Sequence, residues 1–143
     1  MKRGAGAFLL VRTGRRRVGL ALSHVIEVAQ VGAVHPVPSV EPAVRGVVAV
    51  HGRLVPVVHL GALIEAVPCP PASSSLVVVV VLEGRKICLE IDDAEIVVRE
   101  PALPVPPGST LPWAVGVARH PEGLVPLLDL EALSARFTEV SSV

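Results

Sequence analysis

Aromatic side chains are almost absent from this chain, which has two Phe, one Trp and no Tyr among 143 residues. It therefore lacks the stacking platforms that hold single-stranded nucleic acids. An excess of one charge is also missing, because thirteen basic and thirteen acidic residues give a formal net charge of zero. Nucleic-acid binders usually carry a clear positive excess. We therefore predict no nucleic-acid partner.

Long hydrophobic runs and paired cysteines are also lacking. The longest apolar run, Leu76 to Leu82, is far shorter than the ~20 residues that cross a bilayer as a helix. An apolar stretch near the N-terminus is too short for a signal peptide and leads directly into a run of arginines. Cys69 and Cys88 are isolated and form no disulfide framework. We expect a cytoplasmic protein with no direct membrane insertion.

Valine is abundant, with 29 residues in a chain that is 51% hydrophobic. β-Branched side chains suit a pleated, half-buried surface better than a helix. Short apolar runs recur between turn residues, as in the hairpin predicted for residues 8–22 and its counterpart at 76–91. The sequence therefore predicts an all-β fold.

An internal repeat organises the chain. Gly46-Val47 reappears as Gly116-Val117, and the Leu-Val-Pro segment that starts at Leu54 reappears at Leu124, both with an offset of 70 residues. Several matches in the same order indicate two copies of one structural unit.

A proline- and serine-rich segment at residues 67–75 separates the copies and is predicted to be a linker. The first half would span residues 12–66 and the second 76–137, and the N-terminal strand could be shared between them. Units this small bury too little surface to be stable alone. We therefore expect the halves to pack together, with a partner site at the seam between them.

Each half is predicted to end in a short helix. In the second half, Asp129 can cap the helix, and Leu130, Leu133 and Phe137 fall on one face. In the first half the capping position holds His59, a poorer acceptor. We therefore predict that the first helix is the shorter and the more frayed of the two.

Residues 46–60 resemble the central signature of the CheW family of chemotaxis coupling proteins, which is roughly G-x-x-x-L-R-G-x-x-x-P-x-x-D-L. Gly46, Gly52, Pro56 and Leu60 match its fixed positions. Further segments with similar residues follow the family order: 8–11, 25–28, 89–92 and 124–129. The resemblance covers about residues 8–137, nearly the whole chain.

This resemblance implies a single CheW-like domain over residues 1–143, built of two small five-stranded β-barrels packed side by side. It implies a scaffold with no catalysis and no cofactor. One surface would bind the regulatory domain of a histidine kinase, and the seam would bind the cytoplasmic tip of a methyl-accepting chemoreceptor.

The receptor-facing positions of the family correspond to five residues here: Val25, Glu27, Gly46, His51 and Leu76. The apolar members would offer aliphatic surface, Gly46 would allow a backbone to approach, and Glu27 could pair with a basic group. A purely structural alternative stays open, in which Val25 and Leu76 are core residues and Glu27 is simply solvated.

Two departures from the family pattern matter. The family arginine before the second signature glycine is His51 here, and the aspartate before the final leucine is His59. Arginine is always charged and offers a planar fork of donors, whereas histidine offers one or two. Arg53 would point to the same side as His51 if the strand were regular, and so could compensate.

These departures leave several functions open. The chain could be a coupling scaffold, a divergent paralogue that binds only one of the two partners, or a self-associating structural β protein with exposed strand edges.

Catalysis and metal binding have little support in the sequence. It has no CxxC or HExxH pattern, and about 26 Å of regular strand would separate His51 from His59. The acidic pair Asp92-Asp93 indicates a turn. The arginines at 15–17 are interpreted as a solvated hairpin tip, with docking of an anionic partner as the second interpretation. We therefore predict that the chain is not an enzyme.

Overall fold

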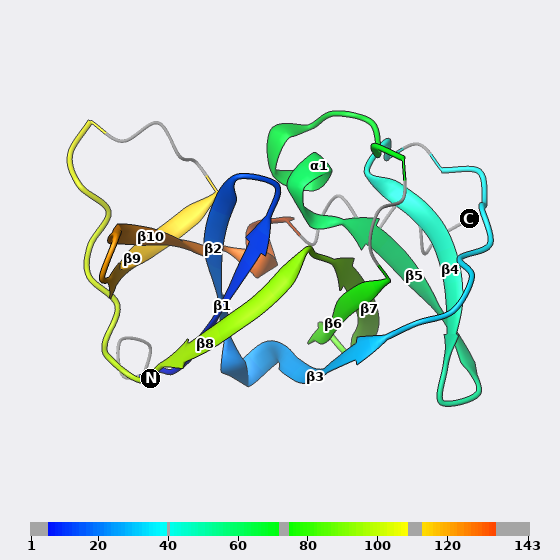
Figure 1. The fold of residues 1–143 in the computed structure, drawn as a ribbon, viewed down its shortest axis with the longest axis horizontal. Helices are drawn as coiled ribbons and strands as arrows, with labels where there is room; N and C mark the ends of the chain where they lie inside the picture. Colours follow the sequence, from blue (N-terminus) through cyan, green and yellow to red (C-terminus); the bar gives the residue numbers. More distant parts are fainter. Residues whose placement is uncertain (1–5, 40, 72–74, 109–112, 134–143) are drawn as a thin grey trace.

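Two five-stranded β-sheets lie side by side along the long axis of the protein (Figure 1). The computed structural model describes residues 6–39, 41–71, 75–108 and 113–133. In spatial order, the first sheet contains β8 (Asp93–Val98), β1 (Phe8–Thr13), β2 (Arg16–Ala21), β10 (Gly123–Leu128) and β9 (Ala114–His120). The second contains β3 (Val25–Gln30), β6 (Leu76–Leu82), β7 (Arg85–Glu90), β5 (Arg53–His59) and β4 (Val44–Val50). This confirms the all-β class.

The two sheets are open, so the expectation of closed barrels is wrong. Within the described residues, no ladder joins edge strands β8 and β9 of the first sheet or β3 and β4 of the second. Instead, a connecting segment crosses to the far edge of each sheet and pairs there by a single bridge. These bridges are His35 with Val47 on β4 and Leu103 with Val117 on β9. They cover edges that would otherwise expose unpaired backbone groups.

The two repeats exchange their N-terminal hairpins. The first sheet combines β1 and β2 of the first repeat with β8, β9 and β10 of the second. The second sheet combines β6 and β7 with β3, β4 and β5. Replacing each strand by the one five places away in the chain converts one strand order into the other, so the repeats are related by a pseudo-two-fold. A boundary between residues 12–66 and 76–137 therefore does not separate the two sheets, because each sheet needs strands from both segments.

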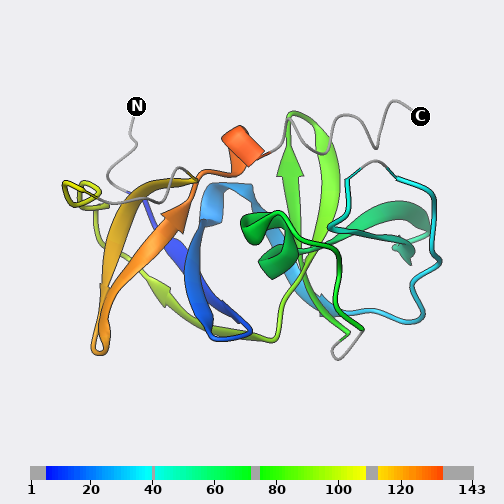
Figure 2. The same cartoon turned by 90° about the horizontal axis from the view of Figure 1, so that it is seen from above.

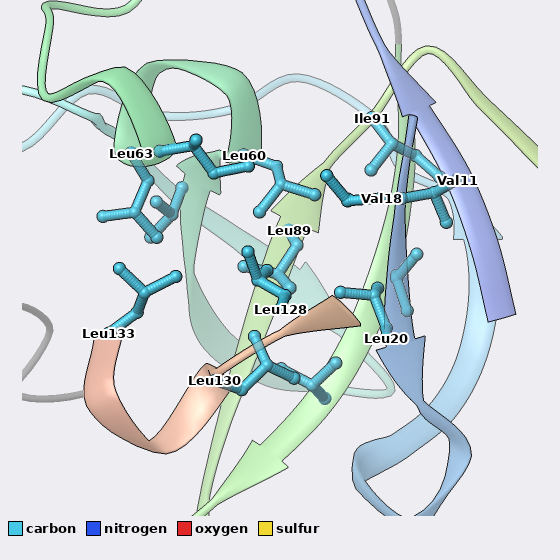
Figure 3. Close-up of a cluster of buried hydrophobic side chains, with 14 of the residues drawn as sticks. Val11, Val18, Leu20, Leu60, Leu63, Leu89, Ile91, Leu128, Leu130 and Leu133 are labelled. Atoms are coloured by element: carbon cyan, nitrogen blue, oxygen red, sulfur yellow. The ribbon is translucent and has the colours of Figure 1, made fainter. Parts of the chain in front are cut away.

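The seam between the sheets is filled by the largest hydrophobic core (Figure 3). The first sheet contributes Val11, Val18 and Leu20, and the second contributes Val80 and Leu89. Further contributors come from the two helices: Leu60, Leu63, Leu130 and Leu133. Because this core contains side chains of both sheets, neither sheet can keep its apolar face covered without the other.

Each sheet also has a smaller core on its other face. In the second sheet, Val77 and Val79 of β6 point into this core, whereas Val78 and Val80 point into the shared one. The first sheet has an equivalent small core around Leu10 and Leu127. A strand buried on both faces reads as a continuous apolar run, as the sequence of β6 does.

One short helix follows the last strand of each repeat, as predicted. Helix α1 (Leu60–Glu65) and a helix that begins at Leu130 both lie over the middle of the protein, between the sheets (Figure 2). The second helix is described to residue 133, so the predicted difference in length and fraying, which extends to Phe137, lies partly outside the described residues. A 3₁₀ turn, Leu22–His24, links β2 to β3.

His59 does cap α1. Its Nδ1 atom accepts a hydrogen bond of 3.0 Å from the Ala62 N–H, and Asp129 Oδ1 accepts one of the same length from the Ala132 N–H. An Nδ1 atom that accepts must be unprotonated. Burial favours this neutral form and lowers the pKa of His59 below its ordinary value of 6.5.

Candidate partner-binding site

Glu27 and His51 meet on the surface of the second sheet. Glu27 lies on edge strand β3, and His51 lies in the turn between β4 and β5 at the opposite edge. The Glu27 Oε2 atom is 2.7 Å from His51 Nε2, and the His51 side chain is 71% exposed. The sheet is therefore curved enough to bring its two edges into contact at this end. Glu27 is a paired group on the rim of the sheet and is not simply solvated.

The backbone of the turn places His51 there. His51 and Gly52 both have positive φ, 49° and 80°, as in the two-residue type I′ turns that match the twist of a hairpin. The chain reverses at these residues, so the regular strand assumed from the sequence is absent at His51. Arg53 is the first residue of β5, pairs across the ladder with Val50 and is exposed. The alternation of side chains along a strand therefore gives no reason to expect Arg53 on the same side as His51.

The space beside Gly46 is filled by another segment of the same chain. A Cβ atom at this position would lie 2.1 Å from the His35 carbonyl oxygen and 3.0 Å from Pro36 Cα. The backbone that approaches Gly46 is therefore the segment that bridges to β4. The equivalent Gly116 has the same relation to Leu103, whose carbonyl oxygen would lie 2.7 Å from a Cβ atom.

Val25 and Leu76 lie at opposite ends of the β3–β6 ladder. Val25 pairs with Val80, and Leu76 pairs with Gln30. Both are partly buried and pack against the shared core. The two residues therefore belong to the rim of the core and are too far apart along the strands to form one small patch with Glu27.

The strands that carry or adjoin the Glu27–His51 pair also expose aliphatic side chains that the sequence interpretation did not include. Ile26 and Val28 adjoin Glu27 on β3, and Leu54 follows Arg53 on β5 with 71% of its surface exposed. Ile26 and Val28 are exposed because they alternate along β3 with the partly buried Val25, Glu27 and Ala29. The resemblance pointed only to Val25 and Glu27, so the interpretation of the sequence left their exposed neighbours out.

A buried ion pair was also missed. Arg45 is the extra residue of a bulge in β4, and its Nε atom lies 2.7 Å from Glu90 Oε1 on β7. Their side chains are 15% and 6% exposed. The equivalent positions of the other repeat hold Val115 and Ala21, so the repeat gives no signal for this pair.

The arginine run at the β1–β2 hairpin is only partly solvated, which corrects the first interpretation. Arg17 lies 2.6 Å from Glu95 and 3.3 Å from Glu122. The hydrogen bond from Arg17 lowers the pKa of the Glu95 carboxyl group. Arg16 lies 3.4 Å from Glu65. Arg15 is exposed, and no described residue forms an ion pair with it.

Other kinds of site find no support in the described part of the chain. No group of three or more His, Cys, Asp or Glu side chains there could hold a metal ion. Burial raises the pKa of the Cys88 thiol to about 11, so the thiol stays protonated and unreactive. None of the helices described is long and apolar enough to span a membrane.

The fold and surface define an all-β module with exchanged hairpins, whose exposed features are suited to contacts with other molecules. The family model of the CheW-like domain matches residues 7–137. The chain therefore belongs to the CheW-like family of scaffold and adaptor proteins.

A solved structure agrees with this assignment. The scaffolding protein TtCheW from Thermoanaerobacter tengcongensis has a similar fold, with a TM-score of 0.76 and 19% sequence identity over 90% of this chain and 92% of that one. No curated protein matches the chain by sequence.

Proposed function

We propose that this chain is a non-enzymatic signalling scaffold that couples the cytoplasmic tip of a methyl-accepting chemoreceptor to the regulatory domain of a CheA-type histidine kinase. The pathway would be chemotaxis-like, and the protein would act in the cytoplasm without a cofactor. The observation that carries the proposal is the CheW-like match over residues 7–137. This match includes all ten strands, and therefore the complete arrangement of exchanged hairpins.

In this proposal the receptor tip contacts the rim of the second sheet at the Glu27–His51 pair. Glu27 engages only the Nε2 atom of the exposed imidazole, and no described residue takes the Nδ1 atom. Leu54 on β5 and Ile26 and Val28 on β3 expose apolar surface on the strands next to this polar pair. A few polar anchors beside apolar surface suit the binding of an amphipathic helix.

The test is to titrate the purified protein with a soluble receptor-tip fragment and, separately, with the kinase regulatory domain, by isothermal titration calorimetry. Glu27→Ala and His51→Ala are each expected to weaken receptor-tip binding roughly tenfold. Their effect on stability should stay within about 0.5 kcal/mol, because exposed ion pairs contribute little. Glu83→Ala is the matched control, since Glu83 also has positive φ in a two-residue hairpin turn of the same sheet.

The wild-type result separates the alternatives. Binding of only one partner would indicate the divergent paralogue. That alternative is considered because His51 and His59 depart from the family signature. Binding of neither, together with self-assembly that grows with concentration, would indicate the structural protein and overturn the proposal.

A further inference from the structure

A groove of about 610 Å³ opens between the β1–β2 hairpin and the region of α1. The hairpin tip and α1 are neighbours in Figure 1, and the Arg16–Glu65 contact joins them. The groove lies between β1 and β2 of the first sheet and α1, which follows β5 of the second sheet. It does not include the Glu27–His51 pair, so it is a separate feature of the surface.

One wall of the groove is cationic. Arg15, Arg16 and Arg17 line it, and Glu65 is the only acidic residue among the described residues of the lining. Arg17 forms ion pairs with two glutamates, whereas Arg15 is exposed and the one ion pair of Arg16 among the described residues is its 3.4 Å contact with Glu65. Because Arg16 also lies 5.5 Å from the centroid of the Trp113 ring, its guanidinium is oriented before any ligand arrives.

Two polar atoms in this wall are buried without partners. The Thr13 hydroxyl and the Arg16 Nε atom have no hydrogen bond, and Thr13 is only 4% exposed. Such groups are costly unless something satisfies them. Gly61 lies beside the hydroxyl, because a Cβ atom there would be 2.7 Å from Thr13 Oγ1. Gly61 has no side chain, and any side chain there would collide with this hydroxyl.

The repeat shows that the fold does not need this hydroxyl. In the ladders, Thr13 pairs with Arg16 as Leu82 pairs with Arg85, so Leu82 is the equivalent residue. Leu82 is apolar and 3% exposed. A polar side chain at position 13 is therefore a local feature of the groove.

The opposite wall is apolar and rich in proline. Val67, Pro68 and Pro70 line it, and all three are exposed. Proline offers no backbone N–H to a ligand, so polar recognition must come from the arginine wall. A ligand that suits both walls carries a carboxylate on one side and an aliphatic group on the other.

We propose that this groove binds an acidic peptide segment of a partner protein. A glutamate or aspartate side chain would accept hydrogen bonds from Arg15, Arg16 and the Thr13 hydroxyl, and an apolar neighbour would pack on Val67 and the prolines. Charge-assisted hydrogen bonds of this kind are the strong ones. The site goes beyond the receptor and kinase contacts and does not depend on them.

The probe is a short, end-capped synthetic peptide in which glutamate alternates with leucine. Binding to the full chain is followed by NMR, through the backbone amides of residues 13–17 and the Arg16 Nε–H signal. The same peptide with glutamine for glutamate, and inorganic phosphate alone, are the comparison ligands. We expect the acidic peptide to shift these signals and to bind at least roughly tenfold more tightly than either comparison.

Three variants sharpen the test. Arg15→Gln and Thr13→Val should each weaken binding of the acidic peptide, by roughly threefold to tenfold. Thr13→Val should leave the unfolding midpoint unchanged or raised, because it removes an unsatisfied hydroxyl while keeping the shape. Arg85→Gln is the matched charge control on the β6–β7 hairpin and should bind like the wild type.

The proposal is overturned if the glutamine peptide binds equally well, or if phosphate shifts the same signals as strongly. The second result would indicate a general anion patch. It is also overturned if Thr13→Val lowers stability and leaves binding intact, since the hydroxyl would then have a purely structural role.

Discussion

At Gly46, a Cβ atom would lie 2.1 Å from the carbonyl oxygen of His35, which belongs to the segment that covers the edge of β4. The obstacle is backbone and cannot rotate away. Gly46→Ala is therefore expected to lower the free energy of unfolding by about 3 kcal/mol. Urea denaturation measures this loss.

Gly32→Ala is the control for Gly46→Ala, because a Cβ atom at Gly32 meets nothing within 4 Å and its φ is not positive. This variant should stay within about 0.5 kcal/mol of the wild type. Equal denaturation midpoints for the two variants would show that the segment at His35 yields easily and that the close approach has little energetic weight.

The residues of the candidate site were predictable in part. The resemblance identified Glu27 and His51 but could not show that they touch, because the contact joins opposite edges of a curved sheet. The close approach expected at Gly46 exists, but its source is His35 of the same chain. Arg45 and Glu90 left no signal, since a single arginine and a single glutamate in strands usually indicate solvated positions.

At the scale of elements, the cap of α1 predicts a dependence of stability on pH. The pKa of His59 is lowered in the folded protein, so the unfolded chain binds the proton more tightly. The contribution of neutral His59 is then complete above about pH 6.5 and is lost as the pH falls through the folded pKa. We expect chemical denaturation to show the wild type losing stability between pH 7.5 and 5.5, by up to about 1 kcal/mol from this residue.

His59→Asn separates this effect from the other histidines. Asparagine caps a helix well and does not titrate, so the variant should lose less stability than the wild type over the same interval. Parallel pH profiles for the two proteins would show that the Nδ1 cap does not control the acid sensitivity of α1.

Most strands were predictable because apolar residues, glycines and prolines mark their extent. Both hairpin pairs and the helix starts lie where the residue pattern indicated. The bulges in β3, β4, β8 and β9 were not predictable, because one extra residue in an apolar strand changes the pattern very little. The partners of each hairpin were not predictable either, because an internal repeat is equally compatible with separate and with exchanged hairpins.

At the scale of the whole molecule, the shared core predicts that both sheets unfold together. Leu10 is fully buried in the small core of the first sheet, and Leu10→Ala should cost about 2–5 kcal/mol. Each sheet contains strands of both repeats, and one central core joins the two sheets. We therefore expect the most protected amides of β6, in the second sheet, to lose as much free energy of protection as the whole protein loses in stability. Native-state hydrogen exchange measures this.

Val67→Ala serves as the control for Leu10→Ala, since Val67 is exposed on the segment after α1, and it should leave the β6 amides unchanged. Loss of protection confined to the first sheet would show that the two sheets open independently in spite of their common core.

The exchange of hairpins also governs the order in which the chain can fold during synthesis. The first sheet cannot be completed when β1 and β2 leave the ribosome, because its remaining strands lie between Asp93 and Leu128. The second sheet has all of its strands once Glu90 has emerged. The nascent N-terminal hairpin must therefore wait, with its apolar faces exposed, and this interval is when a chaperone would be needed most.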